Sequence, residues 1–445
     1  LNAVKKALQE VEGSYAIAVL KKGEKRLIAA RKGSPLVIGV ARNGYFVASD
    51  IPAFLDHTKS VIYLYDGDIV CLDDAIKVYN LKQGEVKRFV DTIDWTSEEI
   101  DKKGFRYYML KEILEQTETL KRASQQDREI VQQIANEINK AYGVFLIGCG
   151  SSYHACLVGS YLFSKIAKKH INVVLASEFP NYEHFLTEKT LIIAVSQSGE
   201  TADVLEAVKA AKRKNAKIIS IVNVRGSSLD REAHHSLLLN AGPEICVLST
   251  KTYTSQIALL LMLARACAGE YEKAQQELRY AWNLAYNLTS RSMREHITKL
   301  AERLKDTEHI FTIGRDIQFP TALEAALKIK EVSYIHAEGF AAGELKHGSI
   351  ALIEEGTPCI VFVGKKVSKE TVSNAAEIKA RGGYLIGVGP EPNEIFDFYI
   401  KVPEVGNVNP ICQIIPIQLL AYKLAILRGY DPDKPRNLAK SVTVK

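Results

Sequence analysis

Hydrophobic and polar positions follow two different patterns along the chain. In residues 1–91, short β-branched runs are separated by Gly or Asn-Gly turns such as Asn43-Gly44, which is typical of antiparallel strands. We expect strands at 14–20, 26–30, 35–41, 45–49, 61–65 and 68–72. This sheet-rich part resembles a fragment of a larger domain, and the charged residues 92–129 that follow it read as a helical connector.

The rest of the chain contains an internal repeat. Three apolar, strand-like runs recur at offsets of 166, 168 and 167 residues, namely 144–148 with 310–314, 191–195 with 359–363, and 217–222 with 384–389. Fully apolar strands that alternate with amphipathic helices indicate parallel sheets covered on both faces. Two unrelated α/β domains are the alternative, but three near-equal offsets favour duplication. We therefore predict two doubly wound domains, at 130–285 and 290–430, followed by a tail at 431–445.

Composition and charge exclude several classes of protein. The 445 residues are 47% hydrophobic and 25% charged, as in ordinary globular proteins of several domains. A net charge of +6 is mild for this length and speaks against a dedicated nucleic-acid binder. The apolar segments 257–266 and 411–427 read as buried helices, because one is too short for a bilayer and the other contains Gln, Pro and Lys.

The cysteines and histidines indicate neither a disulfide framework nor a metal site. Seven cysteines are an odd number without CxxC spacing, which suits a reducing cytoplasm. The ten histidines form no HExxH motif and no Cys/His cluster. We expect no metal, no cofactor, no membrane anchor and no signal peptide.

Polar residues follow the apolar run at 191–195. The segment Ser196-Gln197-Ser198-Gly199-Glu200-Thr201 offers three hydroxyls, an amide and a flexible glycine in front of a predicted helix. Because ligands bind beyond the carboxyl ends of parallel strands, this segment predicts a phosphate cradle. Simple N-capping by Ser198 or Thr201 is the alternative.

Two further hydroxyl clusters occur in the first repeat. Ser151 and Ser152 follow the run at 144–148, and residues 249–252 precede an apolar helix. Each alone is explained equally well by capping. The second repeat has residues 364–368 at the place of the cradle and has lost the Ser-Gln-Ser pattern, so we expect one anion site per chain.

The second repeat carries acid–base groups instead. Glu324, Lys328 and Glu331 share one face of a predicted helix, where a solvent-exposed salt-bridge ladder is the alternative to a functional cluster. His347 lies between glycines, and a histidine that titrates near neutral pH suits proton transfer. Lys440, near the end of the chain, is by itself most simply a solvated lysine.

Several long motifs together resemble the isomerising glutamine–fructose-6-phosphate aminotransferases, or glucosamine-6-phosphate synthases. These are SQSGET, LSTKTYTSQ, ALEAALKIKEVSYIHAEGFAAGELKHG and PRNLAKSVTV, with RKGSPLVIG and VASD in the first part. The resemblance implies two sugar-isomerase (SIS) domains behind part of an N-terminal-nucleophile α+β glutaminase domain. It also implies conversion of fructose 6-phosphate and a glutamine-derived amino group into glucosamine 6-phosphate, which feeds hexosamine and UDP-N-acetylglucosamine synthesis.

The resemblance also assigns roles to residues. His347, from the neighbouring subunit of a homodimer, would open the sugar ring, and Lys440 would form a Schiff base at C2. Glu331 would carry a proton between C1 and C2, and Lys328 would assist proton movements at the hydroxyls. The remaining substrate-binding residues would hold the phosphate or line the sugar, and they are Ser151, Ser152, Ser196, Gln197, Ser198, Thr201, Glu244, Val247 and Ser249.

The sequence departs from the family pattern at two places. The family begins with a cysteine whose own α-amine serves as base, whereas this chain begins with Leu1, so we expect the 445-residue piece to use ammonia rather than glutamine. Ser151 stands where the family commonly has Thr, which keeps the hydroxyl. The alternatives are a glucosamine-6-phosphate deaminase, a sugar-phosphate isomerase, or a non-catalytic sugar-phosphate-binding regulator.

Overall fold

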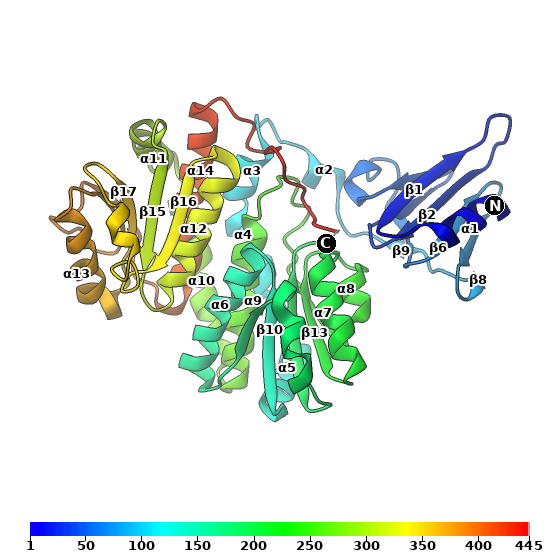
Figure 1. The fold of residues 1–445 in the computed structure, drawn as a ribbon, viewed down its shortest axis with the longest axis horizontal. Coiled ribbons are helices and arrows are strands. Elements are labelled where there is room, and N and C mark those ends of the chain that lie inside the picture. Colours follow the sequence, from blue (N-terminus) through cyan, green and yellow to red (C-terminus); the bar gives the residue numbers. More distant parts are fainter. Residues whose placement is uncertain (444–445) are drawn as a thin grey trace.

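The computed structural model describes residues 1–443, which form three successive parts (Figure 1). The first part starts with helix α1 (Asn2–Glu10) and continues as two antiparallel sheets of order β1-β2-β6-β7-β8 and β4-β3-β5-β9. The strands are β1 (Tyr15–Leu20), β2 (Leu27–Lys32), β3 (Val37–Ala41), β4 (Gly44–Ala48), β5 (Ser60–Tyr63), β6 (Asp68–Leu72), β7 (Ile76–Asn80), β8 (Gly84–Val86) and β9 (Asp91–Thr92).

Three helices lead from this sandwich to the rest of the molecule. They are α2 (Ser97–Ile100), α3 (Tyr108–Leu114) and α4 (Gln116–Ser124). The backbone N–H groups of Tyr108 and Met109 each donate to the Asp433 carboxylate at 2.8 Å, so the start of α3 is tied to the C-terminal segment.

The first α/β repeat has a five-stranded parallel sheet of order β11-β10-β12-β13-β14. Its strands are β10 (Gly143–Gly148), β11 (Asn172–Leu175), β12 (Thr190–Ser196), β13 (Lys217–Val222) and β14 (His235–Leu238). Its helices are α5 (Arg128–Lys140), α6 (Ser151–Leu162), α7 (Ala202–Arg213), α8 (Ser228–Glu232), α9 (Lys251–Cys267) and α10 (Tyr271–Leu288).

The second repeat has the equivalent sheet order, β16-β15-β17-β18-β19. Its strands are β15 (His309–Gly314), β16 (His336–Ala341), β17 (Pro358–Phe362), β18 (Tyr384–Gly389) and β19 (Phe398–Lys401). Its helices are α11 (Arg291–Leu304), α12 (Gln318–Ser333), α13 (Ser368–Lys379) and α14 (Asn409–Leu427). The two equal strand orders confirm the duplication.

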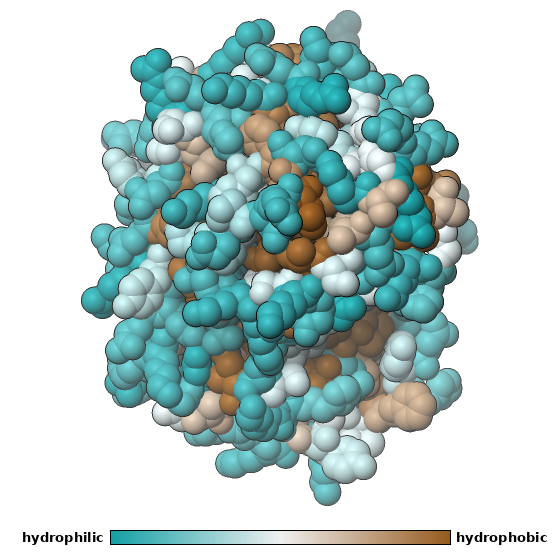
Figure 2. Space-filling model, turned by 90° about the vertical axis from the view of Figure 1, so that its left-hand side faces the viewer, coloured by the Kyte–Doolittle hydropathy of each residue, from teal (hydrophilic) through white to brown (hydrophobic). Residues whose placement is uncertain are grey.

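The core explains why these strands are apolar along their whole length. Every residue of β12 is buried, since helices cover both faces of the sheet. Helices α9 and α14 are buried on nearly all sides, as predicted for the two apolar segments. Only α14, among the described helices, is long and apolar enough to cross a membrane, and 83% of its most apolar window is buried inside the protein. The surface on the side of the second repeat is mainly hydrophilic (Figure 2).

Strand predictions hold for the first part and for the repeated runs, within two residues at each end. The sequence reading omitted α1, the strands β7, β8 and β9, and the edge strands β11, β14, β16 and β19. These elements are short or only partly buried, so their hydrophobic pattern is weak.

Candidate active site

The cradle lies at the point where the first sheet reverses its strand order. Strands β10 and β12 are neighbours from which the chain proceeds to opposite sides, and both carboxyl ends face the same edge. Ser196 is the last residue of β12, and its Oγ lies 3.1 Å from Thr201 Oγ1. The N–H of Gly199 donates to Ser196 Oγ at 3.1 Å, and that of Glu200 donates to Ser198 Oγ at 3.2 Å. The segment therefore curls into a loop lined by hydroxyls.

Capping does not account for the cradle hydroxyls. Thr201 is the N-cap residue of α7, but its side chain accepts no capping hydrogen bond. The first N–H of the helix, that of Ala202, instead donates to the carbonyl oxygen of Val442 at 3.0 Å. The C-terminal segment, red in Figure 1, thus crosses the molecule and ends above α7.

Glu200 connects the cradle to its surroundings. Its carboxylate accepts from the N–H and the hydroxyl of Ser228 at 2.7 and 2.8 Å, and Arg31 of the first part lies 3.5 Å from it. Nearby, the Tyr63 hydroxyl donates to the Arg225 carbonyl at 2.6 Å. The first part therefore docks beside the cradle.

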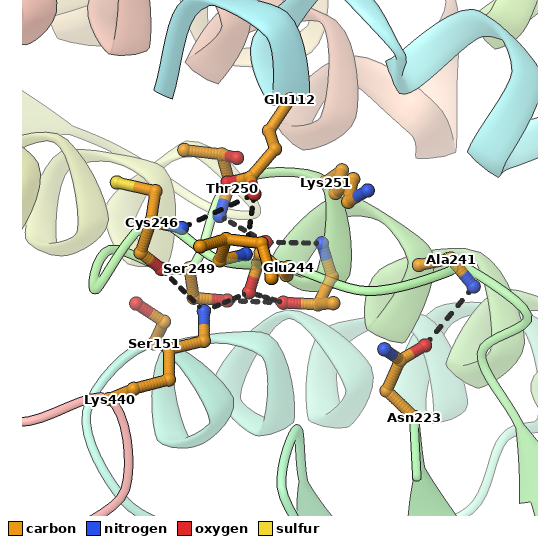
Figure 3. A network of polar contacts seen from close by, with 12 residues as sticks. Glu112, Ser151, Asn223, Ala241, Glu244, Cys246, Ser249, Thr250, Lys251 and Lys440 are labelled. Atoms are coloured by element: carbon orange, nitrogen blue, oxygen red, sulfur yellow. Dashed lines mark hydrogen bonds and ion pairs between the residues drawn. The ribbon is translucent and has the colours of Figure 1, made fainter. Parts of the chain in front are cut away.

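Lys440 is held by a buried carboxylate and is not a freely solvated lysine. Its Nζ donates to Glu244 Oε2 at 2.6 Å and to the Cys246 carbonyl at 2.8 Å (Figure 3). Glu244 also accepts from the N–H groups of Thr250 and Thr252 and from the Thr252 hydroxyl. Burial alone would raise the pKa of Glu244, but Lys440 and these donors outweigh it and lower that pKa.

A second buried carboxyl group, Glu112 of α3, was missed by sequence reasoning. Its Oε1 accepts from the N–H groups of Ile245 and Cys246 at 2.6 and 3.2 Å, while Oε2 has no hydrogen-bond partner among the described residues. Burial and the neighbouring Glu244 raise the pKa of Glu112 to about 8. Nothing in its local sequence distinguishes it from a surface glutamate, because its surroundings come from a loop far along the chain.

Lys328 lies between the two repeats and is completely buried. Its Nζ contacts Glu331 Oε2 at 2.7 Å, Glu324 Oε1 at 3.4 Å, and Ser151 Oγ at 3.0 Å. It also donates to the Ser249 carbonyl at 3.3 Å. The exposed salt-bridge ladder is therefore wrong, because the side chains of Glu324 and Lys328 are both 0% exposed.

Two neighbouring carboxylates offset the cost of burying the Lys328 charge. Burial alone would lower the pKa of Lys328, but the carboxylates of Glu324 and Glu331 more than compensate and raise it above its ordinary value. Glu324 also accepts from Ser151 and contacts His154, both at 2.8 Å. Lys328 is thus a fixed cation that joins the acid–base helix of the second repeat to the hydroxyls of the first.

One cavity of about 530 Å³ joins the cradle, the tail and the first part of the chain. Among the predicted site residues, Gln197, Ser198, Glu244 and Lys440 line it. Lys328 and Glu331 do not line it, but they are linked to it through the 244–252 loop, where Ser249 Oγ lies 2.7 Å from Thr252 Oγ1.

The other predicted residues lie at different distances from this centre. The Ser152 hydroxyl accepts from Gln256 at 2.9 Å, and the Val247 N–H donates to the Asp433 carbonyl at 3.3 Å. His347 lies exposed in a turn of the second repeat, and within residues 1–443 no hydrogen bond or ion pair connects its side chain to the cradle. A single chain therefore places Gln197, Ser198, Glu244 and Lys440 around one cavity, and joins Ser151, Ser249, Lys328 and Glu331 in a neighbouring polar network.

Two doubly wound sheets, with a hydroxyl cradle at the switch point of the first, define a tandem sugar-isomerase protein. In agreement, the SIS domain model matches residues 137–266 and 303–428. The similarity to known proteins extends further, since the whole chain is 46% identical to the glutamine–fructose-6-phosphate aminotransferase [isomerizing] of Thermococcus kodakarensis, of which it covers 76%. The chain belongs to the family of isomerising glutamine–fructose-6-phosphate aminotransferases.

Other comparisons agree. A protein of the same name from Thermus thermophilus is 39% identical over the whole chain, which covers 77% of it. The solved C-terminal domain of glucosamine-fructose-6-phosphate aminotransferase from Francisella tularensis is 33% identical with a TM-score of 0.70, and the match covers 75% of this chain and all of that domain.

A deaminase is also similar, but over less of the chain. The glucosamine-6-phosphate deaminase of Thermotoga maritima is 26% identical with a TM-score of 0.60, over 75% of this chain and 99% of its own. The aminotransferases, in contrast, match the full chain, including the antiparallel first part. The first part therefore distinguishes the two.

Proposed function

We propose that this chain binds fructose 6-phosphate and converts it, with an amino group, into glucosamine 6-phosphate. The observation that carries the proposal is the position of Lys440, which lies in one cavity with Gln197 and Ser198 of the cradle and is held by Glu244. The phosphate would occupy the cradle of Ser196, Gln197, Ser198 and Thr201. A dianion suits this place because hydroxyls and a helix N-terminus both favour negative charge.

The proposed chemistry begins with the tail lysine. Lys440 would attack C2 of the open-chain ketose, and loss of water would give a Schiff base. The incoming amine would then add to C2 and release the Lys440 amine. Attack requires an unprotonated amine, so the Lys440 ammonium must first lose a proton, and Glu244 Oε2, at 2.6 Å, would hold and orient the lysine side chain. Residues of the first part of the chain also line this cavity. An amine supplied on that side would therefore reach the sugar within the same cavity.

The isomerisation would use the buried cluster. Glu331 would move one proton between C1 and C2, because a single carboxylate can return the proton it has taken. Lys328 would fix Glu331 by its 2.7 Å contact and place positive charge near the sugar hydroxyls. Ser151, Ser152, Val247 and Ser249 would line the sugar.

Ring opening would require a second subunit. His347 is exposed and lies apart from the cradle contacts of its own chain, which supports its delivery to the site of a neighbouring copy in a homodimer. Seven free cysteines, four of them deeply buried inside the repeats, suit a reducing cytoplasm, where we place the reaction.

The Schiff base can be trapped directly. Borohydride reduction in the presence of fructose 6-phosphate should add one hexose phosphate to the peptide containing Lys440. Lys440→Arg should lose both this adduct and ammonium-dependent glucosamine 6-phosphate formation, whereas Lys434→Arg, an exposed lysine in the same segment, should keep both. An adduct that persists in Lys440→Arg would remove this residue from the mechanism.

A further inference from the structure

A second pocket lies in the second repeat, at the place that corresponds to the cradle. It has a volume of about 350 Å³ and lies beyond the carboxyl ends of β15 and β17, the pair equivalent to β10 and β12. Its floor includes Gln318, at the start of α12, and Gly364, directly after β17. By the offsets of the repeat, these residues stand where the first half has Ser152 and Ser196. The same switch-point argument that located the cradle therefore applies here.

The pocket has an excess of positive charge. Four lysines line it against two carboxylates, Asp316 and Glu404. Both carboxylates are already engaged, Asp316 with Lys165 and Glu404 with the backbone of residues 365 and 406 and with Asn409. The ammonium groups of Lys365 and Lys366 have no hydrogen-bond or ion-pair partner within the described part of the chain. Both ammonium groups are therefore free to form charge-assisted hydrogen bonds with a bound anion.

A buried amide points to a ligand independently of the lysines. Gln318 is only 2% exposed, yet its side chain makes no hydrogen bond to any residue in 1–443. The amide borders the pocket, so water or a ligand in the pocket can make the hydrogen bonds that the protein does not supply. Gly364 permits this placement, since a Cβ at that position would lie 2.5 Å from Gln318 Nε2. The absence of a side chain at 364 keeps the amide at the pocket wall.

The N-termini of two helices also contribute positive potential to the pocket. Neither α12 nor α13 has a side-chain cap, and residues at the N-terminus of each, Gln318 and Val367, line the pocket. The positive ends of two helix dipoles therefore add to the positive potential that the four lysines create in the pocket. The first half holds its anion with hydroxyls, whereas the second half offers cations and one amide.

We propose that this second-repeat pocket binds a small phosphorylated ligand, separately from the substrate cradle. Lys365, Lys366 and Lys168 would pair with the phosphate, and the Gln318 amide would hydrogen-bond to it or to the adjoining oxygen. The volume suits a molecule of the size of a sugar phosphate. The expectation of a single anion site per chain would then be wrong, because it counted only hydroxyl motifs.

The test separates the two sites by substitution in the full chain. In a Ser198→Ala/Thr201→Ala background, which weakens the cradle, calorimetric titration with glucosamine 6-phosphate should still show saturable binding. Adding Lys365→Ala/Lys366→Ala should weaken this binding at least tenfold, and Gln318→Glu should do the same. Lys21→Ala/Lys22→Ala, an exposed pair with the same charge change, should leave it intact.

Competition and kinetic measurements complete the test. Inorganic phosphate should compete with glucosamine 6-phosphate in the cradle-deficient background, because the phosphate carries the recognition. No saturable binding there, no competition, or binding that survives loss of both lysines would each overturn the proposal. Lys365→Ala/Lys366→Ala alone should leave the KM for fructose 6-phosphate unchanged, so failure of this site is distinguishable from failure of the proposed reaction.

Discussion

At the scale of single residues, the site depends on charges that are buried and paired. Lys328 has 0% exposure and contacts two carboxylates, and Glu244 is equally buried and pairs with Lys440. Such pairs contribute little net stability, but removal of one partner leaves an uncompensated buried charge. These residues therefore fix geometry more than they stabilise the fold.

Loss of the Lys328 charge should be costly. Lys328→Met leaves Glu324 and Glu331 facing each other without a cation, which should lower the free energy of unfolding by about 3–5 kcal/mol. Urea denaturation measures the change. In the double variant Glu324→Gln/Lys328→Met the loss should be smaller than in Lys328→Met alone, and an additive or larger loss would contradict the argument from charge.

Glu112 should make stability depend on pH. Its pKa is raised to about 8 in the folded chain against 4.5 ordinarily, so the folded state keeps a proton that the unfolded state releases. The contribution is complete below about pH 4.5 and is lost as the pH rises through about 8. Glu112→Gln should therefore flatten the fall in Tm over this range.

The matched control for this measurement is Glu118→Gln, an exposed carboxylate on the next helix. Its profile should parallel that of the unsubstituted chain. If Glu112→Gln showed the same slope as the unsubstituted chain, Glu112 would be ionised in the folded state at neutral pH.

At the scale of elements, the strand-to-helix turn after β12 determines the cradle. Gly199 has a φ of +68°, and a Cβ there would overlap the Ser227 hydroxyl. No other residue type satisfies both conditions at low cost, since the left-handed region costs an L-residue about 1–2 kcal/mol. The turn therefore holds Ser196, Ser198 and Thr201 together only while residue 199 is glycine.

Gly199→Ala should accordingly damage binding as well as stability. We expect the KM for fructose 6-phosphate to rise by roughly tenfold or more, because displacement of the loop breaks hydrogen bonds worth about 1 kcal/mol each. Gly13→Ala is the control, since Gly13 has a φ of +84° and a Cβ at that position would meet nothing within 4 Å. Gly13→Ala should lower stability without changing the KM. If Gly13→Ala raised the KM as much as Gly199→Ala does, the cradle would not be the phosphate site.

At the scale of the whole molecule, the site is assembled from segments far apart in sequence. The first part supplies Arg31 and Tyr63, the first repeat the cradle, the second repeat Lys328 and Glu331, and the tail Lys440. Only His347 lies elsewhere on the surface of its own chain. Under the proposed function, His347 of a second chain would complete the set of groups.

Mixing two inactive variants tests this arrangement. His347→Asn and Lys440→Arg should each lack activity alone. When they are unfolded and refolded together, about half of the dimers should be mixed, and each mixed dimer should have one intact shared site. The mixture should therefore regain about a quarter of the unsubstituted activity. Absence of any recovery, with mixed dimers verified, would place His347 in the site of its own chain, and an active His347→Asn variant would place it outside catalysis.

The sequence by itself determined the duplicated parallel sheets and the cradle. Apolar runs that repeat at 166–168 residues and alternate with amphipathic helices favour buried parallel strands, and the polar residues that follow such strands lie at one edge of the sheet. These are local patterns, so they are readable without coordinates. The long motifs added the family by resemblance, and the full-chain match confirmed it.

Only the tertiary structure decided which charges are buried. Helical spacing placed Glu324, Lys328 and Glu331 on one face but left an exposed ladder possible, and the packing of α12 against the first repeat excluded it. The same holds for Lys440, Glu112 and Gln318, whose environments come from residues more than 40 positions away. Burial of a polar group is set by long-range contacts, and a local sequence pattern does not contain them.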